Sequence, residues 1–164
     1  MPPSGKIAEI GSWKGKSSAY LGVEAKNANK SLRIWCVDTW KGCSAVPVQM
    51  KDSAVQTDTL YELFLSNIES LRDIITPIRG DSAASAHNFP DNYFDAVFID
   101  ASHEYENVKA DIAAWYPKVK SGGIFAGHDY PGFPGVVQAV HEFLNANTVK
   151  DFRFSELCWI CEKP

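Results

Sequence analysis

The chain has 164 residues, of which 45% are hydrophobic and 22% are charged, and its net charge is −4 at pH 7. These values are typical of one globular domain with a sizeable core, and they exclude a disordered or fibrous chain. The negative net charge argues against a nucleic-acid partner, because a local basic patch would have to overcome the average field, and the sequence shows none.

No apolar run reaches the roughly 20 residues needed to cross a bilayer, and residues 1–5 lack the features of a secretion signal. We therefore expect a cytoplasmic protein with no membrane partner. The four cysteines lie in apolar, strand-like runs, which favours reduced core thiols. Cys158 and Cys161 form a C-x-x-C pair, but no second pair or nearby histidine completes a zinc site.

Apolar runs of strand length alternate along the chain with segments of helical period, the pattern of a parallel sheet covered on both faces. The predicted elements in chain order are a strand at 6–10, a helix from about 16, strands at 32–37 and 74–78 separated by a helix at 55–72, a strand at 94–100, a helix ending at Pro117, a strand at 124–126 after a turn at 121–123, a helix carrying Val136 to Leu144, and two antiparallel strands within 152–162. The predicted fold class is α/β, with a doubly wound, mostly parallel Rossmann-like sheet and an antiparallel C-terminal hairpin strand. We expect a single domain over residues 1–164, in which the irregular stretch 39–54 is either a lid or a surface insertion.

Acidic residues lie at or beside every predicted parallel strand end. The motifs are Glu9-Ile10-Gly11, Asp38-Thr39-Trp40, Gly80-Asp81-Ser82, Asp100-Ala101-Ser102-His103 and Gly127-His128-Asp129. Ligands of such sheets bind beyond the carboxyl ends of the strands, where the winding reverses. This much carboxylate suits a ligand with hydroxyl groups and a positive charge better than a phosphate without metal.

Two phosphate-containing ligands compete for the loop after the first strand. The dinucleotide fingerprint G-x-G-x-x-G needs a second glycine near the pyrophosphate, and Trp13 takes that place. The phosphate loop G-x-x-x-x-G-K-[ST] is a closer rival, although residues 11–17 are one residue too short for its cradle. A nucleotide hydrolase that uses Lys16, Ser17 and Asp100 is therefore the alternative function.

The strand-end motifs, in their order and spacing, resemble the class I S-adenosylmethionine-dependent methyltransferases, particularly the small-molecule O-methyltransferase branch. The resemblance rests on residues 9–17, 38–40, 80–82, 98–105 and 115–130, and it covers nearly the whole chain from Lys6 to about Leu144. It implies an enzyme that methylates a hydroxyl of a small molecule or sugar, with S-adenosyl-L-methionine as cofactor. A domain that binds the cofactor without turnover is a third interpretation.

The resemblance implies that the first two strand ends hold the methionine and ribose parts of the cofactor. Gly11 and Gly15 would turn the backbone under the methionine, with Glu9 supporting the loop, and Asp38 would accept hydrogen bonds from both ribose hydroxyls. The complete set of expected cofactor-binding residues is Glu9, Gly11, Ser12, Trp13, Gly15, Asp38, Thr39, Trp40, Gly80, Asp81, Ser82 and Asp100.

The adenine is expected beyond the third strand. Asp81 and Ser82 would meet its edge, and Trp40 would lie against its face. The alternative roles are purely structural: a helix cap for Asp81 or Ser82, and a core aromatic for Trp40.

Methyl transfer requires an acceptor atom held in line with the sulfonium methyl and a group that takes the acceptor's proton. His103 and His128 lie on strand-end loops and are the candidate catalytic bases, or else hydrogen-bonding loop residues. A divalent cation such as Mg²⁺ is the second route, because related catechol-type enzymes hold one at the fourth and fifth strand ends. Asp100 and Asp129 are the matching ligands, but Tyr130 stands where those enzymes have an asparagine.

The first predicted strand lies almost at the start of the chain. The helices that precede it and cover the substrate in related enzymes are therefore missing from this sequence. We expect either an open pocket or one closed by a second subunit, so a homo-oligomer is a candidate state beside the small-molecule substrate.

Overall fold

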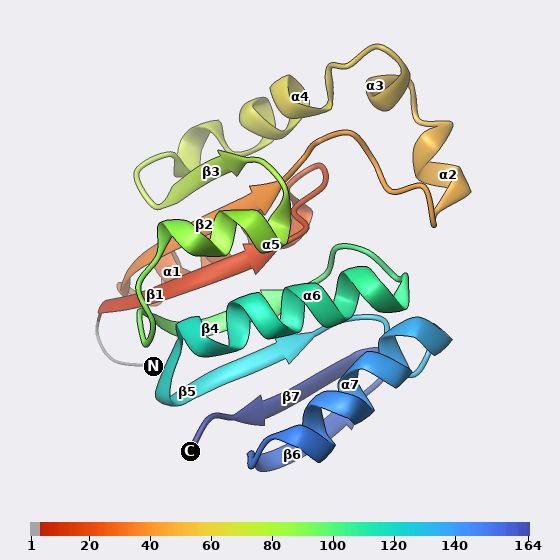
Figure 1. Ribbon diagram of the computed structural model, residues 1–164. Helices are drawn as coiled ribbons and strands as arrows, with labels where there is room; N and C mark the ends of the chain where they lie inside the picture. Colours follow the sequence, from red (N-terminus) through yellow and green to blue (C-terminus); the bar gives the residue numbers. More distant parts are fainter. Residues whose placement is uncertain (1–3) are drawn as a thin grey trace.

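The computed structural model describes residues 4–164 and contains a seven-stranded sheet with the order β3-β2-β1-β4-β5-β7-β6 (Figure 1). The strands are β1 (Ser4–Ile10), β2 (Ser31–Asp38), β3 (Ile75–Arg79), β4 (Phe94–Ile99), β5 (Val119–Gly127), β6 (Lys150–Ser155) and β7 (Cys158–Glu162). The first five strands run parallel, and β7 pairs antiparallel with both β5 and β6. The predicted sheet and its C-terminal hairpin are confirmed.

Helices cover both faces of the sheet, as Figure 1 shows. They are α1 (Lys16–Asn27), α2 (Pro47–Met50), α3 (Ser53–Gln56), α4 (Leu60–Asn67), α5 (Ser82–Ser85), α6 (Tyr105–Trp115) and α7 (Pro134–Ala146), with 3₁₀ turns at 69–71, 86–88 and 116–118. One buried cluster packs α6 and α7 on the sheet, and a second packs α1 and α4 on the opposite face. The fold is therefore doubly wound.

Strand β2 shows why the sequence produces two cores. Leu32, Ile34 and Cys36 belong to the cluster under α1 and α4, whereas Val37 belongs to the cluster under α6 and α7. Successive side chains of a strand point to opposite faces, so a central strand that is buried on both faces becomes an almost continuous apolar run. Burial on both faces is the feature that the apolar runs predicted.

Two predicted elements differ from the structure. The single helix at 55–72 is broken into α3, α4 and a 3₁₀ turn, because Asp58 takes a left-handed conformation with φ of 53°. The Thr57 hydroxyl also donates to the Ser53 carbonyl at 2.8 Å and closes α3. The strand expected at 124–126 begins at Val119, and the predicted turn at 121–123 is an irregularity within β5 with a register shift against β4.

Gly11 joins three strands at the point where the strand order reverses between β1 and β4. Its N–H donates to the Val37 carbonyl of β2 at 2.8 Å, and the Asp100 N–H donates to the Ile10 carbonyl at 2.7 Å. Its φ is +88°, and a Cβ there would overlap the Asp100 carbonyl and lie 2.7 Å from the Ala101 Cα. Only glycine allows this close approach.

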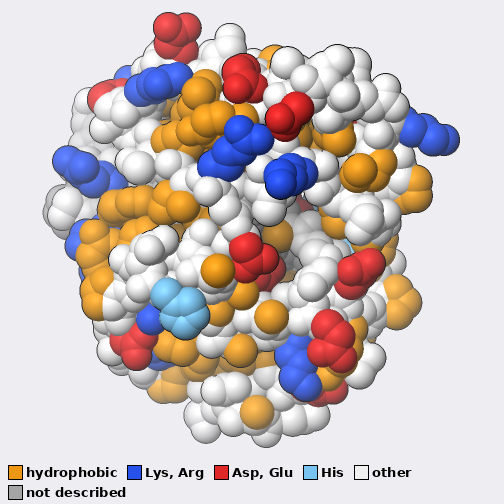
Figure 2. All heavy atoms as spheres, turned by 45° about the horizontal axis from the view of Figure 1, so that its top comes forward, with side chains coloured by type: hydrophobic (Ala, Val, Ile, Leu, Met, Phe, Trp, Pro, Cys, Tyr) orange, Lys and Arg blue, Asp and Glu red, His pale blue; other side chains and the backbone are white. Residues whose placement is uncertain are grey.

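The cysteine side chains are thiols, as the sequence predicts. All four cysteines are free; Cys36 and Cys161 are buried, and Cys43 and Cys158 are half-buried. Within residues 4–164, no helix has both the length and the apolarity to cross a bilayer. Figure 2 shows one face of the molecule, on which basic and acidic side chains are interspersed.

Replacing Gly11 by alanine tests the close approach of β1 to β4, and Gly122→Ala is a matched control. Both glycines have positive φ, but a Cβ on Gly122 would have no neighbour within 4 Å. We predict that Gly122→Ala lowers the free energy of unfolding by about 1–2 kcal/mol through backbone strain alone. Gly11→Ala should cost at least about 2 kcal/mol more, because the backbone must also move. Urea unfolding measures both, and equal losses would contradict the steric argument.

Candidate active site

A cavity of about 290 Å³ opens at the carboxyl ends of β1 to β4, where the strand order reverses. Most of the predicted cofactor-binding residues line it: Gly11, Trp13, Asp38, Thr39, Gly80, Asp81, Ser82 and Asp100. The sheet topology therefore brings four separate strand-end motifs to one place.

The carboxylate of Asp38 organises the loop after β1. Its Oδ2 accepts from the N–H groups of Ser12 at 2.9 Å and Trp13 at 2.8 Å, and its Oδ1 accepts from the Trp40 N–H at 2.7 Å. A carboxylate has about four acceptor positions, so one remains for a ligand hydroxyl in the cavity.

These hydrogen bonds remove the basis of the phosphate-loop alternative. A phosphate cradle needs free backbone N–H groups, but those of Ser12 and Trp13 are bound to Asp38. Lys16 and Ser17 are exposed at the start of α1 and do not line the cavity. The hypothesis of a nucleotide hydrolase is therefore wrong for this loop.

Three other predicted cofactor residues lie behind the cavity wall and shape the loop. Glu9 is fully buried and accepts hydrogen bonds from the Ser18 hydroxyl and from the Cys36 thiol, the latter at 3.5 Å. Ser12 is buried, and a Cβ on Gly15 would lie 3.0 Å from the Phe64 ring of α4. The supporting role expected for Glu9 agrees with this position.

Trp40 lies in the core and not against a ligand. It is 1% exposed, and its ring packs on Tyr61 and Phe64 with centroid distances of 4.7 Å. Its Nε1 donates to the Trp13 carbonyl at 2.9 Å, so it also braces the loop. The expectation that Trp40 stacks on the adenine is therefore wrong, and Trp40 is a core aromatic residue.

The segment 39–54 forms one wall of the cavity. It contains α2 and the start of α3 and contributes Gly42, Cys43, Ser44 and Gln49 to the lining. Lys14 of the β1 loop pairs with Asp52 at 2.5 Å, and this hydrogen bond lowers the pKa of Asp52. The segment is therefore joined to the site and is not a remote insertion.

The sequence analysis missed Asp111 of α6, which also lines the cavity. It is 4% exposed and accepts a hydrogen bond from the Ser82 hydroxyl. Burial, and secondarily the charge of Asp81, raise the pKa of Asp111 from its ordinary value of 3.8 to about 7. The sequence carries a signal for it, because residue 111 lies three positions after Val108 and four before Trp115 and so shares their buried helical face.

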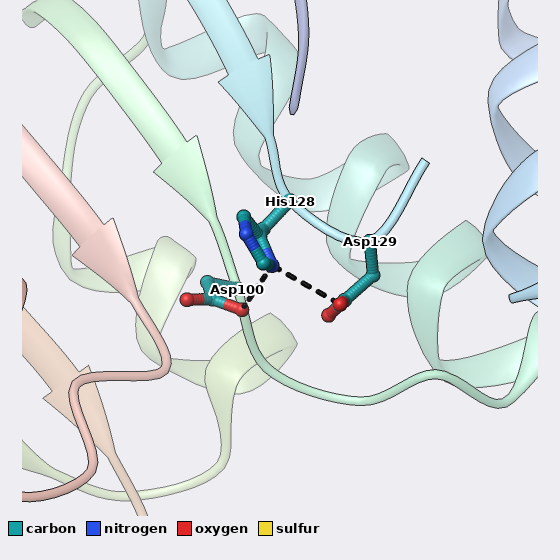
Figure 3. A group of neighbouring side chains, drawn as sticks. All are labelled: Asp100, His128 and Asp129. Atoms are coloured by element: carbon teal, nitrogen blue, oxygen red, sulfur yellow. Dashed lines mark hydrogen bonds and ion pairs between the residues drawn. The ribbon is translucent and has the colours of Figure 1, made fainter. Parts of the chain in front are cut away.

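Acidic and imidazole groups gather at the ends of β4 and β5, as Figure 3 shows for Asp100, His128 and Asp129. The Nδ1 of His128 lies 3.0 Å from Asp129 Oδ1 and 3.7 Å from Asp100 Oδ1. His103 Nε2 lies 2.6 Å from Asp129 Oδ2, and its ring stacks on Phe133. Burial is the main cause that raises the pKa of Asp100 to about 6. All four predicted residues therefore meet, with Asp129 between the two imidazoles.

Three of these residues fit a divalent cation. One ligand atom each from Asp100, His128 and Asp129 lies within 4.8 Å of the others. Carboxylate oxygens suit hard cations, and an imidazole nitrogen widens the choice to transition metals. His128 would supply the third ligand of such a cation in place of Tyr130, whose hydroxyl lies 3.0 Å from His141 Nε2.

Residues 8–130 match the family model described as a methyltransferase domain. The chain belongs to this family. With the cavity at the reversal of the strand order, it is an S-adenosylmethionine-dependent methyltransferase of class I with a Rossmann-like sheet. Among curated protein sequences, none matches this methyltransferase significantly.

Solved structures share its fold. The O-methyltransferase NovP is 18% identical, with 97% of this chain and 72% of that chain covered and a TM-score of 0.74. The calicheamicin methyltransferase CalS11 is 18% identical, with 96% and 72% covered and a TM-score of 0.69. A putative rRNA-methylase from Clostridium thermocellum is 17% identical, with 98% and 89% covered and a TM-score of 0.63. At such identities the likeness concerns the fold alone.

The raised pKa of Asp111 predicts a dependence of stability on pH. Between pH 3.8 and about pH 7 the Asp111 carboxyl group is protonated in the folded state and ionised in the unfolded chain. The free energy of unfolding therefore falls as the pH rises through this range. Asp111→Asn removes this titration and leaves that of Asp100 in place. We predict that the variant gains stability relative to the wild type across this range, and that the gain is constant above about pH 8. Urea unfolding at several pH values measures the difference, and a gain that does not vary with pH would contradict the assignment.

Proposed function

We propose that this methyltransferase transfers the methyl group of S-adenosyl-L-methionine to a hydroxyl of a small molecule, with sugar hydroxyls as one acceptor class. The observation that carries the proposal is the cluster of Asp100, His128 and Asp129 beside the cofactor cavity. Asp100 belongs to both, since it also lines the cavity. Proton-accepting groups therefore lie where an acceptor hydroxyl must be deprotonated.

The cavity is proposed to hold the cofactor through groups that suit a cation with hydroxyls. Gly11 lines the cavity beside the proposed methionine end, and the free acceptor position of Asp38 takes a ribose hydroxyl. Asp38 and Asp100 add negative potential, which favours the sulfonium. Gly80, Asp81 and Ser82 border the adenine end of the same cavity.

In the proposed reaction, the acceptor oxygen attacks the methyl carbon as the carbon–sulfur bond breaks, and S-adenosylhomocysteine leaves. The acceptor's proton passes to the cluster, where the His128 side chain is 35% exposed and is the candidate base. Neither histidine lines the cavity itself, but the His103 side chain is only 14% exposed and its Nε2 is bound to Asp129. We therefore assign His103 the positioning of Asp129, in place of the role of base.

The cluster also supports a role for a divalent cation. Asp100, His128 and Asp129 would hold it, with His128 then a ligand in place of the base, and it would lower the pKa of an acceptor hydroxyl and neutralise the developing charge. His103 fixes the orientation of Asp129 from outside this ligand set. Positioning of this kind keeps the acceptor oxygen in line with the methyl group.

Apolar surface beside the cluster suits a small acceptor. Phe133, on the loop after β5, is 38% exposed while its ring stacks on His103. Leu157, at the turn between β6 and β7, is 44% exposed and approaches the same loop at Gly132. In keeping with a sugar acceptor, the structural neighbour CalS11 is described as a TDP-rhamnose 3'-O-methyltransferase. The net charge of −4 also disfavours a polyanionic acceptor such as RNA.

Turnover with defined acceptors tests the proposal. The purified enzyme, given S-adenosylmethionine and a panel of phenols, sugar nucleotides, amines and an RNA oligonucleotide, should form S-adenosylhomocysteine and an equal amount of a methyl ether. Mass spectrometry identifies the methylated atom. Methylation only of nitrogen or of RNA would contradict the proposed acceptor class.

Removal of metal tests the cation. We predict that treatment with EDTA lowers the turnover number by at least about tenfold and that Mg²⁺ restores it, because the acceptor hydroxyl becomes harder to deprotonate. The affinity for S-adenosylhomocysteine, measured by calorimetry, should stay within about twofold, since Asp38 and not the cation grips the ribose. Full turnover in EDTA would exclude the cation and leave His128 as the base.

A further inference from the structure

Asp111 carries a carboxylate oxygen that the fold does not use. Its Oδ1 accepts from the Ser82 hydroxyl, and its other oxygen makes no hydrogen bond to any group in residues 4–164. That second oxygen is also absent from the polar atoms sealed in the core, and Asp111 lines the cavity. A residue that is 96% buried (4% exposed) therefore presents a free acceptor to the ligand space.

This arrangement is costly for the fold alone. Burying a carboxyl group without a cation disfavours its charged form, and in the described part of the chain no lysine, arginine or histidine pairs with Asp111. Its neighbours on the buried side of α6, Val108, Ile112 and Trp115, are apolar. Packing would be satisfied by an apolar side chain at this position, so the carboxyl group indicates a ligand.

The position of Asp111 relative to the third strand end identifies the part of the ligand that it meets. Ser82, which holds Asp111, follows Gly80 and Asp81, and these residues line the end of the cavity where the proposed function puts the adenine. Asp81 itself is exposed, and its Oδ1 is engaged as the cap of α5 by the Ala84 N–H at 2.8 Å. Asp111 therefore presents its free carboxyl oxygen to this end of the cavity.

We propose that Asp111, oriented by Ser82, accepts a hydrogen bond from the 6-amino group of the cofactor's adenine and makes the cavity selective for adenosyl over 6-oxopurine ligands. The proposal rests on the use of an adenosyl cofactor and not on the identity of the methyl acceptor. Adenine presents an amino donor at this edge. A 6-oxopurine presents a carbonyl oxygen there, which would face the ionised carboxylate of Asp111 without a hydrogen between them.

Calorimetric titration of the full chain with S-adenosylhomocysteine and with S-inosylhomocysteine, its 6-oxo counterpart, tests the proposal. At about pH 8, above the pKa of Asp111, the wild type should bind the adenosyl compound at least about tenfold more tightly, as expected for a hydrogen bond to an ionised carboxylate. In Asp111→Ala and Asp111→Leu the ratio of the two affinities, adenosyl to inosyl, should fall to about three or less. Leucine is similar in size and removes a desolvated charge, so at least one variant is expected to fold.

The affinity ratio separates recognition from structural support. If Asp111 were purely structural, its replacement would weaken the binding of both ligands equally. Asp81→Asn keeps a good helix cap and removes the competing carboxylate, and its ratio should equal that of the wild type. Asp73→Asn, at an exposed carboxylate of an ion pair with Lys26, is the distant control. An unchanged ratio in the folded Asp111 variants, or a loss of the ratio in Asp81→Asn alone, would overturn the proposal.

Discussion

Three backbone N–H groups converge on the carboxylate of Asp38, and the rest of the site depends on this convergence. Two of them come from the loop after β1, so the end of β2 sets the shape of that loop. The loop can take this path only because Gly11 passes against the backbone of β4. The same hydrogen bonds occupy the amides that a phosphate would need, so the site favours a hydroxylated cation over a nucleotide phosphate.

The acidic residues of the site divide into three states, and each state indicates a different role. Asp38 is saturated by backbone donors except for one position, which suits a directional grip on a ribose. Asp129 lies between two imidazoles, an arrangement that handles protons or a cation. Asp111 has a hydroxyl partner and no cation, so its spare oxygen is left for the ligand. These different surroundings are the basis of the three separate roles that we propose for the carboxyl groups.

Much of this site could be predicted from the sequence, because parallel strands bring their carboxyl ends to one edge whatever the details of packing. Asp38, Asp81 and Asp100, which follow β2, β3 and β4, accordingly line one cavity. The position of Trp40 was not predictable, since an aromatic side chain after a strand can point to the ligand or to the core. Here it points to the core, where it packs on Tyr61 and Phe64. The role of His103 depended on its contact with Asp129, which lies 26 residues away (129 − 103) and has no signature in spacing.

The central claim is that the Asp38 carboxylate both orders the β1 loop and holds the cofactor. Calorimetric titration of Asp38→Ala with S-adenosylhomocysteine, beside the wild type and with folding checked by circular dichroism, tests it most directly. The account predicts a loss of affinity of about a hundredfold or more, because the loop amides lose their acceptor and the ribose loses its own. Unchanged affinity in a folded variant would contradict it.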